Sequence, residues 1–119
     1  MPVPFEVSSE QPDGSIHQIT VRGELDLSTA PELAAELRAA REAGGKSILL
    51  DLSDCEFIDS SGLAVIVEAW RDLNGREGED RMVMCGAQIQ VQRLLRITGT
   101  DKAISVFADA GEALASLRD

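Results

Sequence analysis

The sequence Ser47-Ile48-Leu49-Leu50-Asp51-Leu52, followed by Asp59-Ser60-Ser61-Gly62, decides the fold. The first stretch is an apolar run of strand length, typical of a strand that is covered by helices on both faces. A short link through Asp54 and an apolar segment, Cys55 to Ile58, lead to the second stretch, where an amphipathic helix begins. This succession of a buried strand and a helix is the unit from which α/β domains are built.

The helix after Gly62 is predicted from a stripe of apolar residues at helical spacing. We expect it to end near Asn74-Gly75, because glycine commonly follows the last helical residue. We also expect the Trp70 side chain to lie in the core. The members of the stripe are Leu63, Ile66, Val67, Trp70 and Leu73.

Upstream, the pattern predicts strands near Phe5–Ser8 and over Ile16–Gly23, with Gly23-Glu24-Leu25-Asp26 leaving the second strand. A helix should follow, because Thr29 and Glu32 have the spacing of a capping box. Its apolar residues recur at helical spacing, and Gly44-Gly45 should end it.

Downstream, the elements continue to alternate. We expect a polar loop, a strand, a helix closed by Gly99, a short strand and a terminal helix capped by Asp109. The first four span Arg76–Arg81, Met82–Cys85, Gln88–Thr98 and Ser105–Phe107.

This alternation predicts a single α/β domain over residues 1–119, with its core at about 16–117 and an opening strand and turn in 1–15. We expect a mixed, partly parallel β-sheet packed with about four α-helices. The chain has 119 residues, of which 44% are hydrophobic, and this is enough to bury one core.

The charge balance excludes two classes of partner. Acidic residues outnumber basic ones 21 to 11, giving a formal net charge of −10. Nucleic acids and anionic membranes both require a basic face, so we expect neither as a partner. Met1–Glu10 lacks the basic start of a signal peptide, and no apolar run is long enough to span a membrane. We therefore expect a cytoplasmic protein.

The chain has too few residues of the kinds that catalysis or metal binding requires. Two separated cysteines, Cys55 and Cys85, and one histidine, His17, cannot supply a zinc site, and reduced, packed thiols are the simpler reading. Gly45-Lys46-Ser47 lacks the upstream glycine of a phosphate-binding loop, since Ala40 occupies that position. Ser60 and Ser61 lack the glycines of a nucleophile elbow. We predict no enzyme activity, no metal and no cofactor.

Asp59-Ser60-Ser61-Gly62 has more polar groups than a helix start requires. One side chain is enough to cap a helix, at about 1 kcal/mol, so at least one hydroxyl should remain free and face solvent. A phosphate on that hydroxyl would meet unpaired N–H groups and the positive end of the helix dipole. The segment therefore suits phosphorylation without a change of fold.

Four segments together resemble the STAS domain of bacterial anti-sigma factor antagonists, and the resemblance runs from about Ile16 to Leu117. The segments are Gly23-Glu24-Leu25-Asp26, Ile48-Leu49-Leu50-Asp51-Leu52, Phe57-Ile58-Asp59-Ser60-Ser61-Gly62-Leu63, and Arg93-Leu94-Leu95 with Thr98-Gly99.

The resemblance implies a partner-switching mechanism. The unmodified protein would bind an anti-sigma factor that is also a serine kinase, and so release the sigma factor. That kinase would phosphorylate Ser60, the serine directly after the aspartate, and a PP2C-like phosphatase would reverse the modification. Asp26 and Asp59 match acidic residues near the phosphorylation site, and we expect partner contacts at Asp26, Asp59, Ser61, Gly62 and Leu63.

Two alternatives remain open at this point. Ser61 rather than Ser60 could be the phosphate acceptor, although we expect Ser61 to cap the helix. The domain could instead be a module without phosphorylation, which binds a nucleotide or another small anion at the same helix start. A module of that kind could also serve as a subunit of a larger signalling assembly.

Overall fold

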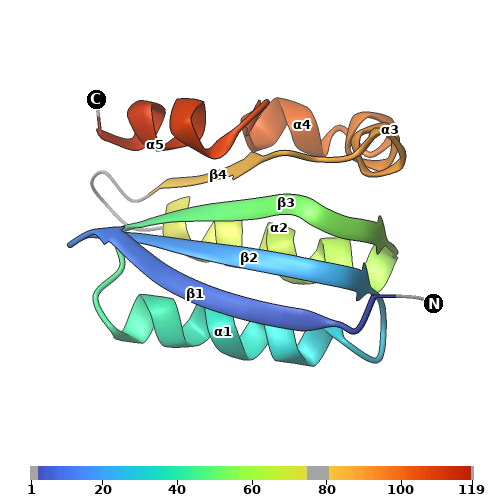
Figure 1. The fold of residues 1–119 in the computed structure, drawn as a ribbon, viewed down its shortest axis with the longest axis horizontal. Coiled ribbons are helices and arrows are strands. Elements are labelled where there is room, and N and C mark those ends of the chain that lie inside the picture. Colours follow the sequence, from blue (N-terminus) through green and yellow to red (C-terminus); the bar gives the residue numbers. More distant parts are fainter. Residues whose placement is uncertain (1–2, 75–80, 119) are drawn as a thin grey trace.

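A computed structural model of the chain describes residues 3–74 and 81–118. Most of the polar loop expected between Arg76 and Arg81 lies outside these residues. Within them are five strands and five helices (Figure 1). The strands are β1 (Glu6–Asp13), β2 (Ile16–Leu25), β3 (Ser47–Ile58), β4 (Arg81–Cys85) and β5 (Val106–Phe107). The helices are α1 (Ala30–Glu42), α2 (Ser60–Asn74), α3 (Ile89–Ile97), α4 (Thr100–Ala103) and α5 (Ala110–Arg118).

The sheet is mixed and mostly parallel, which confirms the predicted fold class. Its strands lie in sequence order, β1-β2-β3-β4-β5. β1 runs antiparallel to β2, and the pairs β2–β3, β3–β4 and β4–β5 are parallel. The carboxyl ends of β2 to β5 therefore meet at one edge of the sheet, where the loops to the following helices begin.

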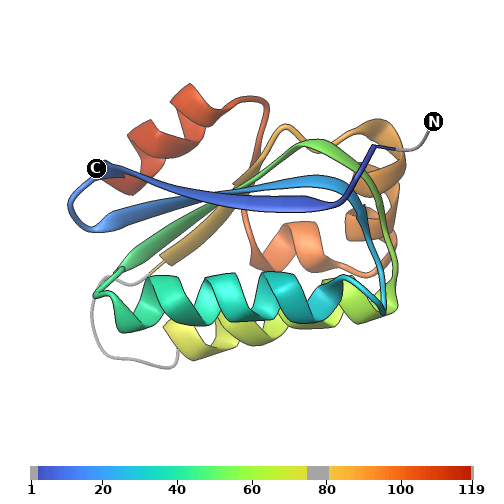
Figure 2. The same ribbon diagram turned by 60° about the horizontal axis from the view of Figure 1, so that its bottom comes forward.

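Helices cover the sheet unequally. α1 and α2 lie side by side on one face, and α5 lies on the other (Figure 2). On the first face, α1, α2 and α3 contribute Leu33, Ile66 and Leu95 to a core that includes Ile19 and Leu50. On the second face, α5 contributes Ala113 and Leu117 to a smaller core. β3 is thus covered on both sides, as its apolar run predicts.

β2 and β3 both extend further than the sequence predicts. The expected link before Cys55 is part of β3, and Gly23 to Leu25 continue β2 instead of leaving it. The strands stay paired because the register of β2 against β3 shifts between Thr20 and Arg22 and again after Gly23. Gly23 has φ +92, a conformation that glycine adopts readily and that bulges commonly use.

The helices agree with the predicted ranges, with one addition. Gly99 ends the α3 segment with φ 77, and Asp109 Oδ1 caps α5 by accepting from Glu112 N at 2.9 Å. The missed element is α4, which is too short to show apolar periodicity. Trp70 on α2 is half-buried and packs against the core.

Both cysteines are buried free thiols, Cys55 in β3 and Cys85 in β4. Burial raises the pKa of Cys55 to about 11 and that of Cys85 to about 12, and nearby Asp51 adds to the shift of Cys85. Both thiols are therefore neutral in the folded protein at every physiological pH.

We expect the free energy of unfolding to fall in alkaline solution. Since the folded-state pKa values lie above the ordinary value of 9.0, the thiols' contribution is complete below pH 9.0 and declines between pH 9 and pH 12. Urea titrations at pH 8 and pH 10 should differ by roughly 1–3 kcal/mol. The chain has no tyrosine to titrate in the same range. A Cys55→Ala/Cys85→Ala variant with the same pH slope would contradict this assignment.

Candidate functional site

The candidate site lies at the edge of the sheet where β2 and β3 end. The last residues of these strands, Leu25 and Ile58, are paired, and the Asp59 N–H donates to the Leu25 carbonyl at 3.1 Å. Asp26 and Asp59 are the next residues in each chain segment. The structure therefore brings together two segments that are far apart in the sequence, as the predicted site requires.

Asp59 caps α2. Its Oδ1 accepts from Gly62 N at 3.0 Å, and its carbonyl accepts from Leu63 N at 3.0 Å. The expectation that Ser61 caps the helix is wrong, because Asp59 occupies the residue directly before the first turn and reaches the free N–H groups of that turn.

The Ser60 side chain is exposed and the Ser61 side chain is half-buried. Neither hydroxyl makes a hydrogen bond with the residues that the structure describes. Because Asp59 satisfies the cap, the Ser60 hydroxyl is free at the first turn of α2, as expected for a modifiable group.

Gly62 and Leu63 face inward. A Cβ on Gly62 would lie 2.6 Å from Leu25 Cγ and 2.8 Å from the Leu25 carbonyl oxygen. Only glycine allows α2 to approach the end of β2 so closely. Leu63 is 8% exposed and belongs to the core. Both residues therefore fix the position of the Ser60 turn.

Asp26 organises the loop between β2 and α1. Its Oδ1 accepts from Ser28 Oγ at 2.7 Å, Ser28 N at 2.9 Å and Thr29 N at 3.2 Å. These bonds, the one from the Ser28 hydroxyl above all, lower the pKa of the Asp26 carboxyl, which is ionised at neutral pH.

The capping box predicted for Thr29 and Glu32 is wrong. The Thr29 hydroxyl donates to the Glu24 carbonyl at 2.8 Å and accepts from Asp26 N at 2.8 Å. It therefore joins the loop to β2, and Asp26 binds the N–H groups before α1.

Sequence reasoning missed the exposed apolar side chains at this edge. Leu27 is 74% exposed beside Asp26, and Phe57 is 45% exposed near the end of β3. We define the Ser60 surface as Asp26, Leu27, Phe57 and Ser60. In the sequence, Leu27 is an isolated apolar residue among polar loop residues and belongs to no apolar stripe. This isolation could have marked it as an exposed residue.

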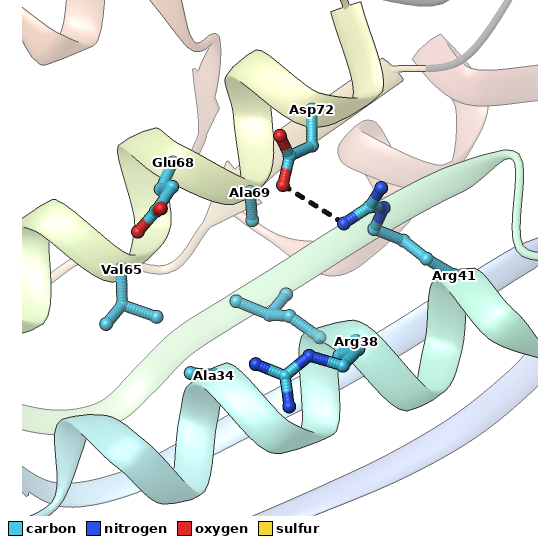
Figure 3. Close-up of a pocket in the computed structure, with 8 residues that line it drawn as sticks. Ala34, Arg38, Arg41, Val65, Glu68, Ala69 and Asp72 are labelled. Atoms are coloured by element: carbon cyan, nitrogen blue, oxygen red, sulfur yellow. Dashed lines mark hydrogen bonds and ion pairs between the residues drawn. The ribbon is translucent and has the colours of Figure 1, made fainter.

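A separate pocket lies between α1 and α2 (Figure 3). Arg41 Nη1 and Asp72 Oδ2 form an ion pair at 3.0 Å across it, and the side chains of Arg38 and Glu68 also line it. Basic and acidic groups are thus balanced, and the pocket lies along the helices rather than at Ser60. It offers no support for the alternative of an anion held at the α2 start.

The residues that the structure describes form neither a metal site nor a membrane-spanning helix. No group of three or more His, Cys, Asp and Glu side chains in 3–74 and 81–118 is placed to hold a metal ion. In these ranges, no helix has the length and apolar character needed to cross a membrane. His17 is buried in β2 and lies within hydrogen-bond distance of Gln11 Nε2, at 3.2 Å.

Comparison with known proteins gives the family. The model of the STAS domain matches residues 8–113, nearly the whole chain. The chain belongs to the STAS domain family. An anti-sigma-B factor antagonist of Listeria monocytogenes is 34% identical to this STAS domain over 94 residues, which cover 79% of this chain and 81% of the relative.

Solved structures of anti-sigma factor antagonists have the same fold as this chain. An anti-sigma factor antagonist from Mycobacterium paratuberculosis has a TM-score of 0.88 and 27% identity, covering 98% of this chain and 96% of its own. The anti-sigma factor antagonist SpoIIAA in its unphosphorylated form shares the fold, with a TM-score of 0.80 and 22% identity, covering 95% of this chain and 96% of its own. The resemblance and the fold inferred from the sequence are both confirmed.

The cap assignment predicts different effects for neighbouring substitutions. Asp59→Ala should lower the free energy of unfolding by about 1 kcal/mol, because it removes the acceptor for Gly62 N. Ser60→Ala and Ser61→Ala should each stay within about 0.5 kcal/mol of the parent. Urea denaturation followed by circular dichroism measures all three. If the free energy of unfolding falls more in Ser61→Ala than in Asp59→Ala, Ser61 and not Asp59 caps the helix.

Proposed function

We propose that this STAS domain is an anti-sigma factor antagonist controlled by phosphorylation of Ser60. Its unmodified form binds an anti-sigma factor that is also a serine kinase, and this binding releases the sigma factor. The observation that carries the proposal is the free, exposed hydroxyl of Ser60 beside a cap that Asp59 already supplies. Relatives named as anti-sigma-B factor antagonists support the same function.

The modification is a phosphoryl transfer. The Ser60 Oγ attacks the γ-phosphorus of ATP, a P–Oγ bond forms, the bond to the leaving oxygen of ADP breaks, and the hydroxyl proton passes to a base of the kinase. A PP2C-like phosphatase reverses the modification. In that step, water displaces the serine oxygen from phosphorus, and inorganic phosphate leaves. The antagonist supplies only the nucleophile in this scheme, so it needs no catalytic residue of its own.

The fold tolerates the added phosphate, whereas a docked partner would not. A phosphate adds about −1.5 to −2 charges. The α2 dipole and its first N–H groups favour that charge at Ser60. A partner seated on Leu27 and Phe57 would have to bury it or move away. A hundredfold loss of affinity needs only about 2.7 kcal/mol, which a single misplaced charge can supply.

The Ser60 surface combines apolar and acidic groups. Leu27 and Phe57 provide apolar contact, and the ionised Asp26 sets the charge of the surface beside them. The kinase face that binds here should therefore be apolar opposite Leu27, Phe57 and Ser60, with a basic group only opposite Asp26, so that a charge added at Ser60 finds no partner.

Phosphorylation should be confined to one residue. Incubating the protein with candidate anti-sigma factor kinases and MgATP should place one phosphate on Ser60, detected by mass spectrometry of the peptide. Ser61→Ala should be modified at the same rate, and Ser60→Ala should not be modified. A phosphate found on Ser61 in the parent protein, or no phosphate with any candidate kinase, would count against the switch.

Ser60→Asp should weaken binding to the anti-sigma factor by about a hundredfold, because it places a charge in the contact. The melting temperature should stay within a few degrees of that of the parent protein, because the Ser60 side chain is exposed. Calorimetry and thermal denaturation measure the two effects. Ser8→Asp, an exposed change in β1 on the face opposite Val7, is the matched control and should bind normally. A Ser60→Asp variant that unfolds would instead mark the serine as structural.

A further inference from the structure

Helix α3 carries an exposed surface that the folded core does not use. Ile89 is 66% exposed and Ile97 is 83% exposed, and both Arg93 and Arg96 are exposed between them. In chain order, successive members of this set are four, three and one residues apart. This spacing puts all four on one side of the helix. We call these four residues the α3 surface.

The opposite side of α3 holds the helix in place. Val91 and Leu95 are each 1% exposed and lie in the main core. The Gln88 side chain donates to the Ser53 carbonyl at 3.0 Å, and the Gln90 side chain donates to the Glu56 carbonyl at 2.8 Å. The helix is thus anchored without Ile89 or Ile97, whose exposure has no structural purpose in the isolated domain.

The charge of the α3 surface is opposite to that of the chain. The net charge is −10, yet α3 contains no acidic residue. Arg93 and Arg96 form no ion pair with any residue of 3–74 and 81–118. Two free cations between two exposed isoleucines match a partner segment that carries both carboxylates and apolar side chains.

A cavity adjoins this surface between α3, α4 and β5. Leu95, Val106 and Phe107 supply its apolar lining, and Arg96 and Asp101 border it. An apolar side chain of a partner can enter this cavity while a neighbouring carboxylate pairs with Arg96. A preformed cavity with a charged rim is a common anchor point of protein interfaces.

The α3 surface begins next to the Ser60 surface. Ile89 follows the carboxyl end of β4, at the same edge of the sheet as Ser60, and the Gln90–Glu56 bond ties the start of α3 to the residue before Phe57. A partner that covers Phe57 and Ser60 therefore lies within reach of α3. Two arginines in a chain of charge −10 do not suit an anionic membrane or a nucleic acid.

We propose that the α3 surface is a second contact area for the anti-sigma factor and binds an acidic segment of it that bears apolar side chains. This inference rests on the proposed function. The α3 surface selects which anti-sigma factor is bound, whereas phosphorylation at Ser60 decides when binding occurs. The two functions are carried by different residues, because no residue of the α3 surface belongs to the modified turn.

The test measures binding of the purified chain to its anti-sigma factor by calorimetry at low and high salt. Arg93→Glu/Arg96→Glu should weaken binding at low salt by roughly tenfold or more, and added salt should then restore part of the binding instead of weakening it, because the charge attraction becomes a repulsion that salt screens. Ile97→Ser should weaken binding with the salt dependence unchanged. Lys46→Glu, an exposed change at the opposite edge of the sheet, is the control and should have little effect.

The outcomes separate the two proposals. If the parent does not bind any anti-sigma factor, both the proposed function and this inference fail. If the parent binds and Ser60→Asp weakens it, but the α3 variants bind like Lys46→Glu, only the α3 inference is overturned. Binding of the parent to vesicles of anionic lipid, lost in Arg93→Glu/Arg96→Glu, would also overturn it and assign α3 to a membrane. Equal melting temperatures show that each variant folds.

Discussion

The contact between Gly62 and Leu25 is the constraint on which the site depends. It allows the first turn of α2 to lie directly against the end of β2, although almost forty residues separate the two in the chain. The hydrogen bond from Asp59 to the Leu25 carbonyl fixes the same junction from the β3 side. Any side chain at position 62 would push the helix outward and move Ser60 with it.

Two aspartates, Asp59 and Asp26, have separate structural roles at this junction. Asp59 caps α2, and Asp26 accepts hydrogen bonds from Ser28 and Thr29 in the loop before α1. The side-chain hydrogen bonds at both helix starts are therefore supplied without Ser60. A hydroxyl that the fold does not use can change its chemistry at little cost to the structure, and the apolar exposure of Leu27 and Phe57 turns that change into a signal for a partner.

The alternation of strands and helices could be predicted because it depends on local pattern: the apolar run Ile48–Leu50 and the stripe on α2 both have a clear period. The lengths of β2 and β3 could not, since their pairing continues through a bulge at Gly23 that no local pattern marks. At the site, the free hydroxyl was predictable from the excess of polar groups. The cap at Asp59 and the role of Thr29 rest on local hydrogen bonds, but several neighbouring polar side chains could have made them, and no sequence pattern chooses among these.

The separation of α3 into a buried side and an outward side has an evolutionary consequence. Val91 and Leu95 hold the helix, so the outward residues can be replaced with little loss of stability. Duplicated copies of such a domain could diverge there while keeping the same serine and the same fold. Parallel signalling circuits within one cell would then remain insulated from one another.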